Sequence, residues 1–369
     1  MSKIEYKKLY EIVQTVNAPV KLKTEEYQLT GNYPIIDQGK EFQAGFTDDE
    51  NALLPLGEYI LYGDHTLSVK YYNGRFAQGA DGLKILKCKE GIEKFIYYAL
   101  CTFNLHSNEY KRHWTQAKQI SIPLPPLAIQ QEIVSVLDSF TTLIDKMKKE
   151  VEMRKKQMEV YREKLLSFKD GDCEWKIIGS CINHLRTGLN PRVHFKLNTP
   201  DADGYYITVR ELKGFKFEPD EKTDRINHEA VLRINERSNL QIGDVLFSGT
   251  GTIGRTAYVD KEPTNWNIKE GVYAITPNKD IIDSIYLIHC LLSQKFMEEV
   301  EQKAGGSTVR SISMMDFKNI KIPVPPLSVQ QEIVRTLDAF ETYISKLEKL
   351  ITLRQKQYEY YREKLLTFE

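Results

Sequence analysis

Hydrophobic residues recur with spacings that alternate between four and three in two long stretches of the chain. In the first stretch they are Ile133, Leu137, Phe140, Ile144, Met147, Val151, Arg154, Met158, Tyr161, Leu165 and Phe168. In the second they are Ile333, Leu337, Phe340, Ile344, Leu347, Ile351, Arg354, Tyr358, Tyr361, Leu365 and Phe368. This pattern is typical of helices that pair in a coiled coil. Each seam has one polar exception, Arg154 or Arg354, which we expect to fix the register of the pair.

The two stretches are copies of each other. Residues 121–168 align with residues 321–368 at a constant offset of 200, and 28 of the 48 aligned positions are identical. Each copy begins with a proline-rich segment, which favours extended backbone before the helix. Such a segment could instead be a ligand for an SH3-like domain, but a strand leading into a helix needs the same residues. Ser328 with Gln331 predicts a capping box that starts the second helix, and Ala128 removes it from the first copy.

Neither helix can bury its hydrophobic seam alone. About 40 helical residues would rise roughly 60 Å at 1.5 Å per residue. We therefore expect the two copies to pack against each other, antiparallel, within one chain. Pairing of each helix with another molecule is the alternative.

The segments outside the helices alternate short hydrophobic runs with turn residues. In residues 1–120 we expect an edge strand at 33–36, because it contains Pro34, further strands at 59–62 and 66–72, a hairpin turn at Asn73-Gly74 and a helix over 92–104. Residues 170–320 repeat this plan with little identity. The matches are 174–179 with 5–10, 206–209 with 33–36, 243–249 with 57–63, and Ile285, Tyr286 and Cys290 with Ile96, Tyr97 and Cys101.

The composition is that of a globular protein of two or three domains. The chain has 369 residues, of which 41% are hydrophobic and 28% charged, with 51 basic and 51 acidic side chains. No signal peptide or membrane-spanning run is expected, and the five cysteines show no paired spacing, which favours reduced thiols and a cytoplasmic location. Zero net charge argues against a free-standing DNA-binding protein, so the electrostatic attraction to any DNA would have to come partly from a partner protein.

A glycine-rich segment, Gly249 to Thr256, resembles two nucleotide-binding patterns. It contains GxGxxG and is one residue from GxxxxGK[ST]. Both patterns require a following helix whose N-terminus receives phosphate. Residues 256–259 are strand-like instead, and Arg255 replaces the lysine. We therefore expect a glycine-rich turn that holds Arg255 at a surface.

A second segment, residues 304–313, combines backbone freedom with hydroxyl groups and one arginine. These groups suit contacts to phosphates and base edges, so Ser307, Thr308 and Arg310 join Arg255 as candidate DNA-binding residues. Weaker candidates in other loops are Arg210, Lys213, Arg192, Arg75 and Tyr72. Solvated loops without a binding role are the alternative. The histidines do not cluster at metal-ligand spacing, and no catalytic residues or metal ligands are predicted.

These features together resemble the specificity subunit of type I restriction–modification systems. The resemblance is carried by the repeated PxPPLxxQQEIV segment with its coil, by GDVLFSGTGTIGR and by GSTVRSIS, and it covers the whole chain. It implies an α+β fold, in which two α/β target recognition domains of mixed or antiparallel sheet are separated by two long helices packed as an antiparallel intramolecular coiled coil. The implied boundaries are recognition domains at 1–120 and 170–320 and coiled-coil spacers at 121–169 and 321–369. Residues 1–120 lack a clear GTGTIGR or GSTV counterpart.

The resemblance also implies a function. Each recognition domain would bind one half of a split site in double-stranded DNA, and two modification subunits would dock along the coils. This chain would be non-catalytic and hold no cofactor. S-adenosylmethionine, ATP and Mg²⁺ would belong to modification and restriction subunits, which methylate adenine and translocate and cut DNA. The alternatives are a coiled-coil adaptor that does not bind DNA and an enzyme with an unrecognised site.

Overall fold

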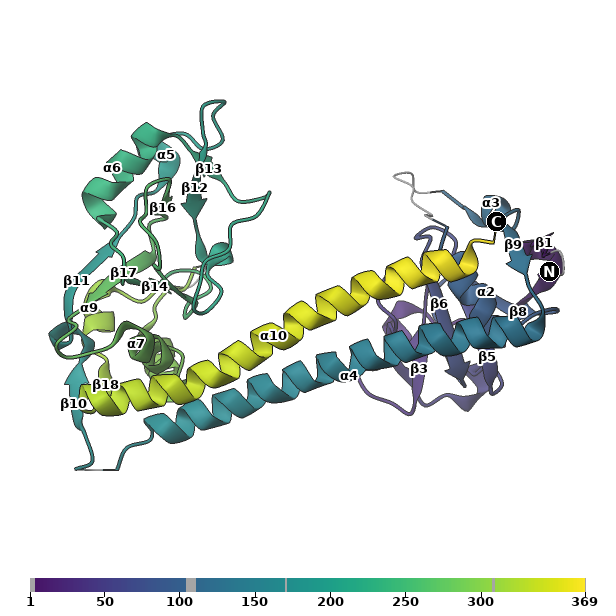
Figure 1. The fold of residues 1–369 in the computed structure, drawn as a ribbon, viewed down its shortest axis with the longest axis horizontal. Coiled ribbons are helices and arrows are strands. Elements are labelled where there is room, and N and C mark those ends of the chain that lie inside the picture. The colour runs from purple at the N-terminus through teal and green to yellow at the C-terminus, as the bar shows by residue number, and fades with distance from the viewer. Residues whose placement is uncertain (1–3, 104–110, 170, 307–308, 369) are drawn as a thin grey trace. The chain divides into compact units, whose positions relative to one another are not determined.

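The chain folds into two compact units. A computed structural model describes residues 4–103, 111–169, 171–306 and 309–368. The first unit contains residues 1–149 and 348–369, and the second contains residues 150–347. Each unit therefore combines one recognition segment with part of each long helix (Figure 1). The four-part division expected from the repeats remains a prediction.

The first unit is built from small β-sheets. β2, β8, β5 and β6 form an antiparallel sheet in that order, β3 lies between antiparallel β4 and parallel β7, and β1 pairs with β9. The strands are β1 (Glu5–Lys8), β2 (Val13–Val16), β3 (Tyr33–Ile36), β4 (Gly45–Thr47), β5 (Gly57–Gly63), β6 (Val69–Gly74), β7 (Ala77–Gln78), β8 (Leu83–Cys88) and β9 (Ser121–Leu124). The helices besides the long ones are α1 (Leu9–Ile12), α2 (Glu93–Leu100) and α3 (Trp114–Ala117), with 3₁₀ turns η1 (Thr24–Glu26) and η2 (Glu50–Ala52).

The second unit repeats this strand pairing. β11, β17, β14 and β15 form an antiparallel sheet, β12 lies between antiparallel β13 and parallel β16, and β10 pairs with β18. The strands are β10 (Glu174–Ile177), β11 (Ile182–Thr187), β12 (Gly204–Ile207), β13 (Arg225–Ile226), β14 (Val245–Ser248), β15 (Thr256–Tyr258), β16 (Trp266–Ile268), β17 (Val272–Pro277) and β18 (Lys321–Val324). The other elements are α5 (Pro191–His194), α6 (His228–Ser238), α7 (Ser284–Leu291), α8 (Gln294–Lys303), α9 (Met314–Lys318), η3 (Ile178–Ser180) and η4 (Val209–Glu211).

Two expectations for the first unit are wrong. β3 is not an edge strand, since it has a partner on each side. Pro34 is tolerated there because Phe46, opposite it in register, exchanges both backbone hydrogen bonds with Gln28 instead. Asn73-Gly74 is not a hairpin turn: both residues lie in β6, opposite Glu58 and Gly57, and the β5–β6 connection lies earlier, at residues 64–68.

The long helices are α4 (Leu127–Leu166) and α10 (Leu327–Leu366), again offset by 200 residues. The expected capping box is wrong, because α10 begins at Leu327 and Ser328 already lies inside it. A buried glutamine fixes each helix start instead. Gln330 donates to the Pro325 carbonyl at 2.8 Å and accepts from Asp283 N at 2.9 Å. Gln130 makes the equivalent bonds, to Pro125 and from Ile92 N.

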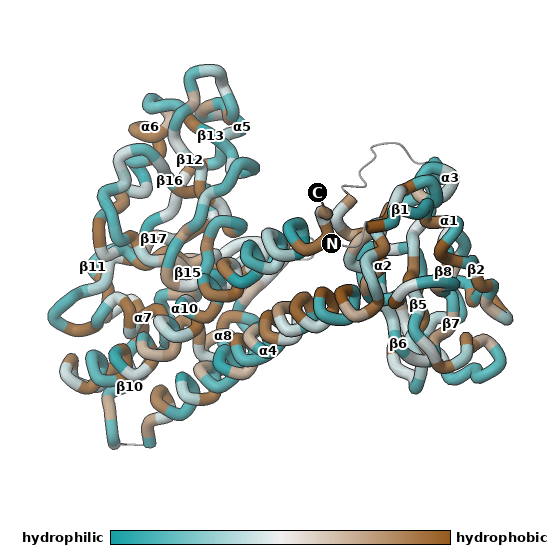
Figure 2. Tube along the Cα trace, turned by 45° about the vertical axis from the view of Figure 1, so that its right-hand side comes forward, coloured by the Kyte–Doolittle hydropathy of each residue, from teal (hydrophilic) through white to brown (hydrophobic). Residues whose placement is uncertain are grey.

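The helices pack antiparallel within both units. The rings of Phe140 and Tyr361 stack at 5.5 Å in the first unit, and the equivalent pair, Tyr161 and Phe340, lies at 5.3 Å in the second. Hydrophobic segments recur along α4 between hydrophilic ones (Figure 2). The antiparallel intramolecular pairing expected from the sequence is confirmed.

Ten of the 22 predicted seam residues are buried, ten more are half-buried and two are exposed. The buried members are Ile133, Leu137, Ile144, Met147, Val151, Met158, Ile333, Leu337, Ile344 and Tyr358. Near the C-terminal ends the buried face shifts: Tyr161 and Tyr361 are each 40% exposed, while Leu166 and Leu366 are buried. A helix with 3.6 residues per turn drifts from a strict heptad pattern, which accounts for the shift. Phe168 and Phe368 lie beyond the helix ends and are not seam residues.

One buried histidine makes the second unit sensitive to acid. His289 on α7 is fully buried, its ring lies 5.0 Å from that of Phe215, and neither ring nitrogen has a hydrogen-bond partner among the described residues. Burial, with the positive charge of Arg162, lowers the pKa of His289 to about 3. In the unfolded chain the histidine pKa is near 6.5. Between pH 3 and pH 6.5 His289 is therefore protonated in the unfolded chain but not in the folded chain.

We predict that His289 leaves the free energy of unfolding undiminished above about pH 6.5 and lowers it progressively as the pH drops toward 3. The loss reaches about 1.4 kcal/mol per pH unit, or roughly 2 kcal/mol at pH 5 relative to pH 7. His289→Leu should remove this part of the slope. Urea unfolding of the parent and of His289→Leu at pH 7, 6 and 5 measures the pH dependence of the free energy of unfolding. Equal pH dependence in the two proteins would contradict the role given to His289.

Candidate nucleic-acid interface

The glycine-rich segment forms a tight turn between β14 and β15. A strand follows the turn rather than a helix, as the sequence predicted. The Ser248 hydroxyl accepts from Arg255 N at 2.8 Å and donates to the Thr252 carbonyl at 2.7 Å. Gly254 has φ +96°, a left-handed conformation that favours glycine, and a Cβ there would also require the Met297 side chain, 2.5 Å away, to move. The turn is thus fixed by internal bonds and leaves Arg255 exposed.

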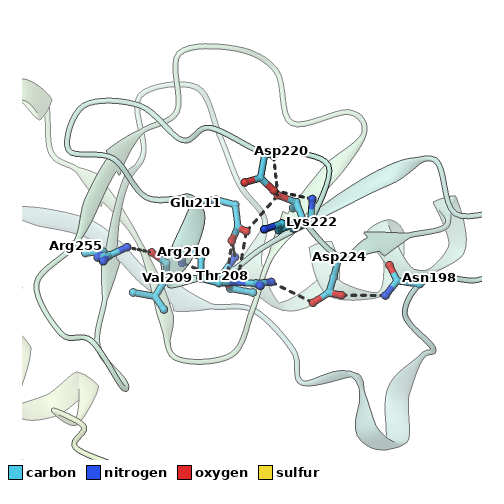
Figure 3. Close-up of polar contacts among 10 residues, drawn as sticks. Asn198, Thr208, Val209, Arg210, Glu211, Asp220, Lys222, Asp224 and Arg255 are labelled. Atoms are coloured by element: carbon cyan, nitrogen blue, oxygen red, sulfur yellow. Dashed lines mark hydrogen bonds and ion pairs between the residues drawn. The ribbon is translucent and has the colours of Figure 1, made fainter. Parts of the chain in front are cut away.

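The β14–β15 turn contacts the 3₁₀ turn η4, which follows β12. The Arg255 guanidinium donates to the Val209 carbonyl at 3.3 Å. The neighbouring Arg210, 58% exposed, lies 3.5 Å from Asp224, which in turn accepts from Asn198 (Figure 3). Two arginines far apart in the sequence are therefore brought to one polar surface.

A buried carboxylate that sequence reasoning missed holds η4 in place. The Glu211 side chain is 4% exposed and accepts from Thr208 N at 2.8 Å and the Thr208 hydroxyl at 2.7 Å. It also accepts from the Thr223 hydroxyl at 3.3 Å, which connects the turn to the segment just before β13. The spacing Thr208-x-x-Glu211 is that of a capping box and was visible in the sequence.

The segment around Arg310 also contacts the β14–β15 turn. The Arg310 carbonyl accepts from Gly251 N at 2.9 Å, and Ser311 forms a bridge with Thr250. The exposed Arg310 side chain donates to the Glu301 carbonyl at 2.9 Å. Ser307 and Thr308 lie outside the described residues.

The weaker candidates of the second unit differ in position. Lys213 is exposed on a turn whose Gly214 N donates to the Thr256 carbonyl at 2.9 Å, so it lies beside β15. Arg192 is exposed on α5, and the described contacts do not join it to Arg210 or Arg255.

In the first unit, Arg75 and Tyr72 lie around the β6–β7 connection. The Arg75 guanidinium lies 5.3 Å from the centre of the Tyr33 ring and 3.7 Å from Glu50. The Tyr72 hydroxyl donates to the Arg75 carbonyl at 3.3 Å, and burial raises the pKa of Tyr72. Both side chains are therefore partly buried and already engaged within the unit.

The family model described as "Type I restriction modification DNA specificity domain" matches residues 1–153 and 198–355. The chain belongs to this specificity family. It is 31% identical to the Escherichia coli type I restriction enzyme EcoR124I/EcoR124II specificity subunit, over 94% of this chain and 90% of that one. It is 31% identical to a putative type I restriction enzyme specificity subunit of Haemophilus influenzae, over 100% of this chain and 96% of that one.

A solved structure supports the fold. The crystal structure of a type I restriction–modification S subunit from M. genitalium matches with a TM-score of 0.59 at 15% identity, covering 100% of this chain and 97% of that one. Specificity subunits are the non-catalytic members of type I systems, so this chain is not itself an enzyme. None of the helices among the described residues is long and apolar enough to cross a membrane.

The coil of this specificity subunit places its two seam arginines in different surroundings. Arg154 lies 3.4 Å from Glu150 and 5.5 Å from the centre of the Tyr343 ring on α10, and the Tyr343 hydroxyl donates to Glu150 at 2.9 Å. Arg354 donates to Gln357 on its own helix at 2.8 Å. The contacts of Arg154 join the two helices, whereas the Arg354 bond stays within one.

Arg255 and Arg210 differ in their charged partners. Among the described residues the Arg255 guanidinium donates to a backbone carbonyl and has no carboxylate partner, whereas the Arg210 guanidinium lies 3.5 Å from Asp224 and 3.8 Å from Glu211. An arginine without a carboxylate partner is available to phosphates or to guanine edges.

Proposed function

We propose that the chain recognises a split target in double-stranded DNA, with each unit binding one half. The observation that carries this proposal is the repeated strand pairing: both units have the same sheets in the same order, followed by the same helix. Two equivalent binding units in one chain suit two half-sites at a fixed spacing.

The proposal also includes the partners. Two modification subunits would dock along the coil and bring S-adenosylmethionine to methylate adenine, while restriction subunits would bring ATP- and Mg²⁺-dependent translocation and cleavage in the cytoplasm. The formal net charge of this chain is zero, so part of the attraction to DNA phosphates would come from those subunits.

The binding of labelled duplexes to the chain assembled with its modification subunits tests the proposal. The target duplex should bind more tightly than duplexes scrambled in either half, and raising the salt concentration should weaken all of them. An assembled complex that binds every duplex equally, or none, would contradict sequence recognition.

We predict that Arg255→Ala and Arg310→Ala weaken binding through the second unit. An arginine that contacts a base edge should cost about 1–3 kcal/mol and relax preference at one position, whereas a phosphate contact should weaken all sequences alike. In the second unit Ser307 and Thr308 would add hydroxyl contacts and Arg210, Lys213 and Arg192 smaller ones, whereas Arg75 and Tyr72 would contribute to the first unit. The measurement is competition binding of the assembled complex against single-base variants of the target.

Arg237→Ala provides the control, since Arg237 is an exposed arginine of the same unit paired with Glu270 at the end of α6. It should leave affinity and preference unchanged. Unchanged affinity and preference in both Arg255→Ala and Arg310→Ala would refute the assignment.

We propose that Arg154 and Arg354 fix the register of the coil. The bond network of Arg154, Glu150 and Tyr343 suits this role, because it joins the helices at one position. The double change to leucine should keep or raise stability while allowing slipped or intermolecular pairing. Light scattering and cysteine crosslinking across the coil measure this, and unchanged mass and pairing would count against the register role.

A further inference from the structure

The first unit has no sequence counterpart of the glycine-rich turn, but the fold supplies a structural one. β3 matches β12, since each lies between an antiparallel and a parallel partner, and β5 matches β14 within the larger sheet. Residues 37–44, between β3 and β4, therefore take the place of the loop that begins with η4. The β5–β6 connection takes the place of the turn that carries Arg255.

The first matched contact is a side chain that ties this loop to the neighbouring hairpin. Lys70 lies opposite Leu61 in the β5–β6 pair, and Thr256 lies opposite Phe247 in the β14–β15 pair, at the same register. The Lys70 amine, 6% exposed, donates to the Asp37 carbonyl at 2.9 Å and to that of Glu41. The Thr256 hydroxyl donates to the Gly214 carbonyl at 2.8 Å.

The second matched contact comes from the connecting turn. Gln38 and Val209 are each the second residue after their strand. The Gln38 carbonyl accepts from the hydroxyls of Thr66 and Ser68, the latter at 2.9 Å, whereas the Val209 carbonyl accepts from Arg255.

The third matched contact lies within the first turn of the loop itself. The Asp37 carboxylate accepts from Gly39 N at 2.8 Å, and the Thr208 hydroxyl accepts from Arg210 N at 3.3 Å. Gly39 thus stands where the second unit has Arg210, and the next side chain is the exposed Lys40.

We infer that residues 37–44 form the DNA-recognition loop of the first unit, with Lys40 as its cationic contact to the duplex. This inference rests on the proposed function. Lys70 and the hydroxyls of the Asp64–Ser68 connection hold the loop through its backbone carbonyls. The ring of Phe42, which is 51% exposed, lies 6.1 Å from that of Tyr72. Tyr72 then supports the loop, and Lys40 donates to a phosphate or to a base edge.

Lys40→Ala in the chain assembled with its modification subunits tests this inference. Competition binding should show a loss of about 5- to 150-fold on the target. If Lys40 contacts a base, its loss relaxes the preference at one position of one half-site. If Lys40 contacts a phosphate, its loss weakens binding to all sequences alike and lowers the salt dependence of binding. Lys89→Ala is the matched control, because Lys89 is an exposed lysine just beyond the end of β8 that lies away from the β5–β6 connection. It should bind like the parent.

Arg255→Ala, measured in parallel, distinguishes failure of the loop assignment from failure of the proposed function. The half-site that it alters belongs to the second unit, so a Lys40 effect on base preference must fall in the other half. If Arg255→Ala acts and Lys40→Ala does not, or acts on the same half, the loop assignment is wrong while the proposed function stands. If the parent complex shows no sequence preference, the proposed function itself fails. Should Lys40→Ala lower the melting temperature, Lys40→Gln keeps the aliphatic stem and allows the same comparison.

Discussion

Asp244→Ala lowers the free energy of unfolding by about 3–5 kcal/mol, because it leaves a buried guanidinium without its counter-ion. Asp244 is fully buried and lies 2.8 Å from Arg186, whose side chain is 13% exposed. The carboxylate also accepts from Gln241 N at 2.9 Å and from the Thr276 hydroxyl. Burial raises the pKa of Asp244, and these hydrogen bonds and Arg186 oppose the shift. The pair joins the start of β14 to β11 and β17 and so supports the strand that leads to the Arg255 turn.

Denaturant unfolding of the purified chain measures this effect, with two controls. Glu58→Ala changes the matching position of the first unit, where the side chain is partly exposed, and should cost far less. The double change Arg186→Met with Asp244→Leu removes both charges and should be more stable than Asp244→Ala, since an apolar pair often replaces a buried ion pair without loss. A double variant as unstable as the single one would show that packing, rather than charge, dominates at this position.

Lengthening both long helices by one heptad increases the gap between the two half-sites of the DNA target. We expect seven residues inserted between Lys149 and Glu150, and seven between Leu347 and Glu348, to keep the seams in phase at the boundaries between the units. Seven helical residues rise about 10 Å, which corresponds to roughly three base pairs of duplex. The bases preferred in each half should not change, because neither recognition segment is altered.

Methylation-site mapping with the lengthened chain and its modification subunits measures the spacing. A four-residue insertion after Glu150 alone is the comparison: it adds about 6 Å to one helix, shifts the heptad phase and should cost stability. An active seven-residue variant that keeps the parental spacing would show that the helices do not set the gap. Altered bases in either half would show that recognition is not modular.

The sequence predicted the coil better than the recognition segments, and the reason is physical. A seam repeated over 40 residues predicts both the helix and the need for an antiparallel partner, and the rings of Phe140 and Tyr161 do pack on rings from α10. Short strands carry little periodicity. The sequence around Pro34 does not indicate that it lies in a central strand, or that Gln28 makes the backbone hydrogen bonds with Phe46.

The candidate site shows the same limit. The exposed position of Arg255 followed from its glycine-rich turn, but its contact with Val209 depends on strands distant in the sequence. The match between Lys70 and Thr256 was invisible, because a lysine and a threonine share no sequence signal and only strand register aligns them.

The measurement that tests the central claim most directly is a map of the adenines methylated by the chain assembled with its modification subunits, for the parent and for Arg255→Ala. Two equivalent binding units predict a target of two short blocks at one fixed spacing, with Arg255→Ala relaxing one block and leaving the other unchanged. A single continuous block, or a variant that alters both blocks together, would contradict the assignment of one half-site to each unit.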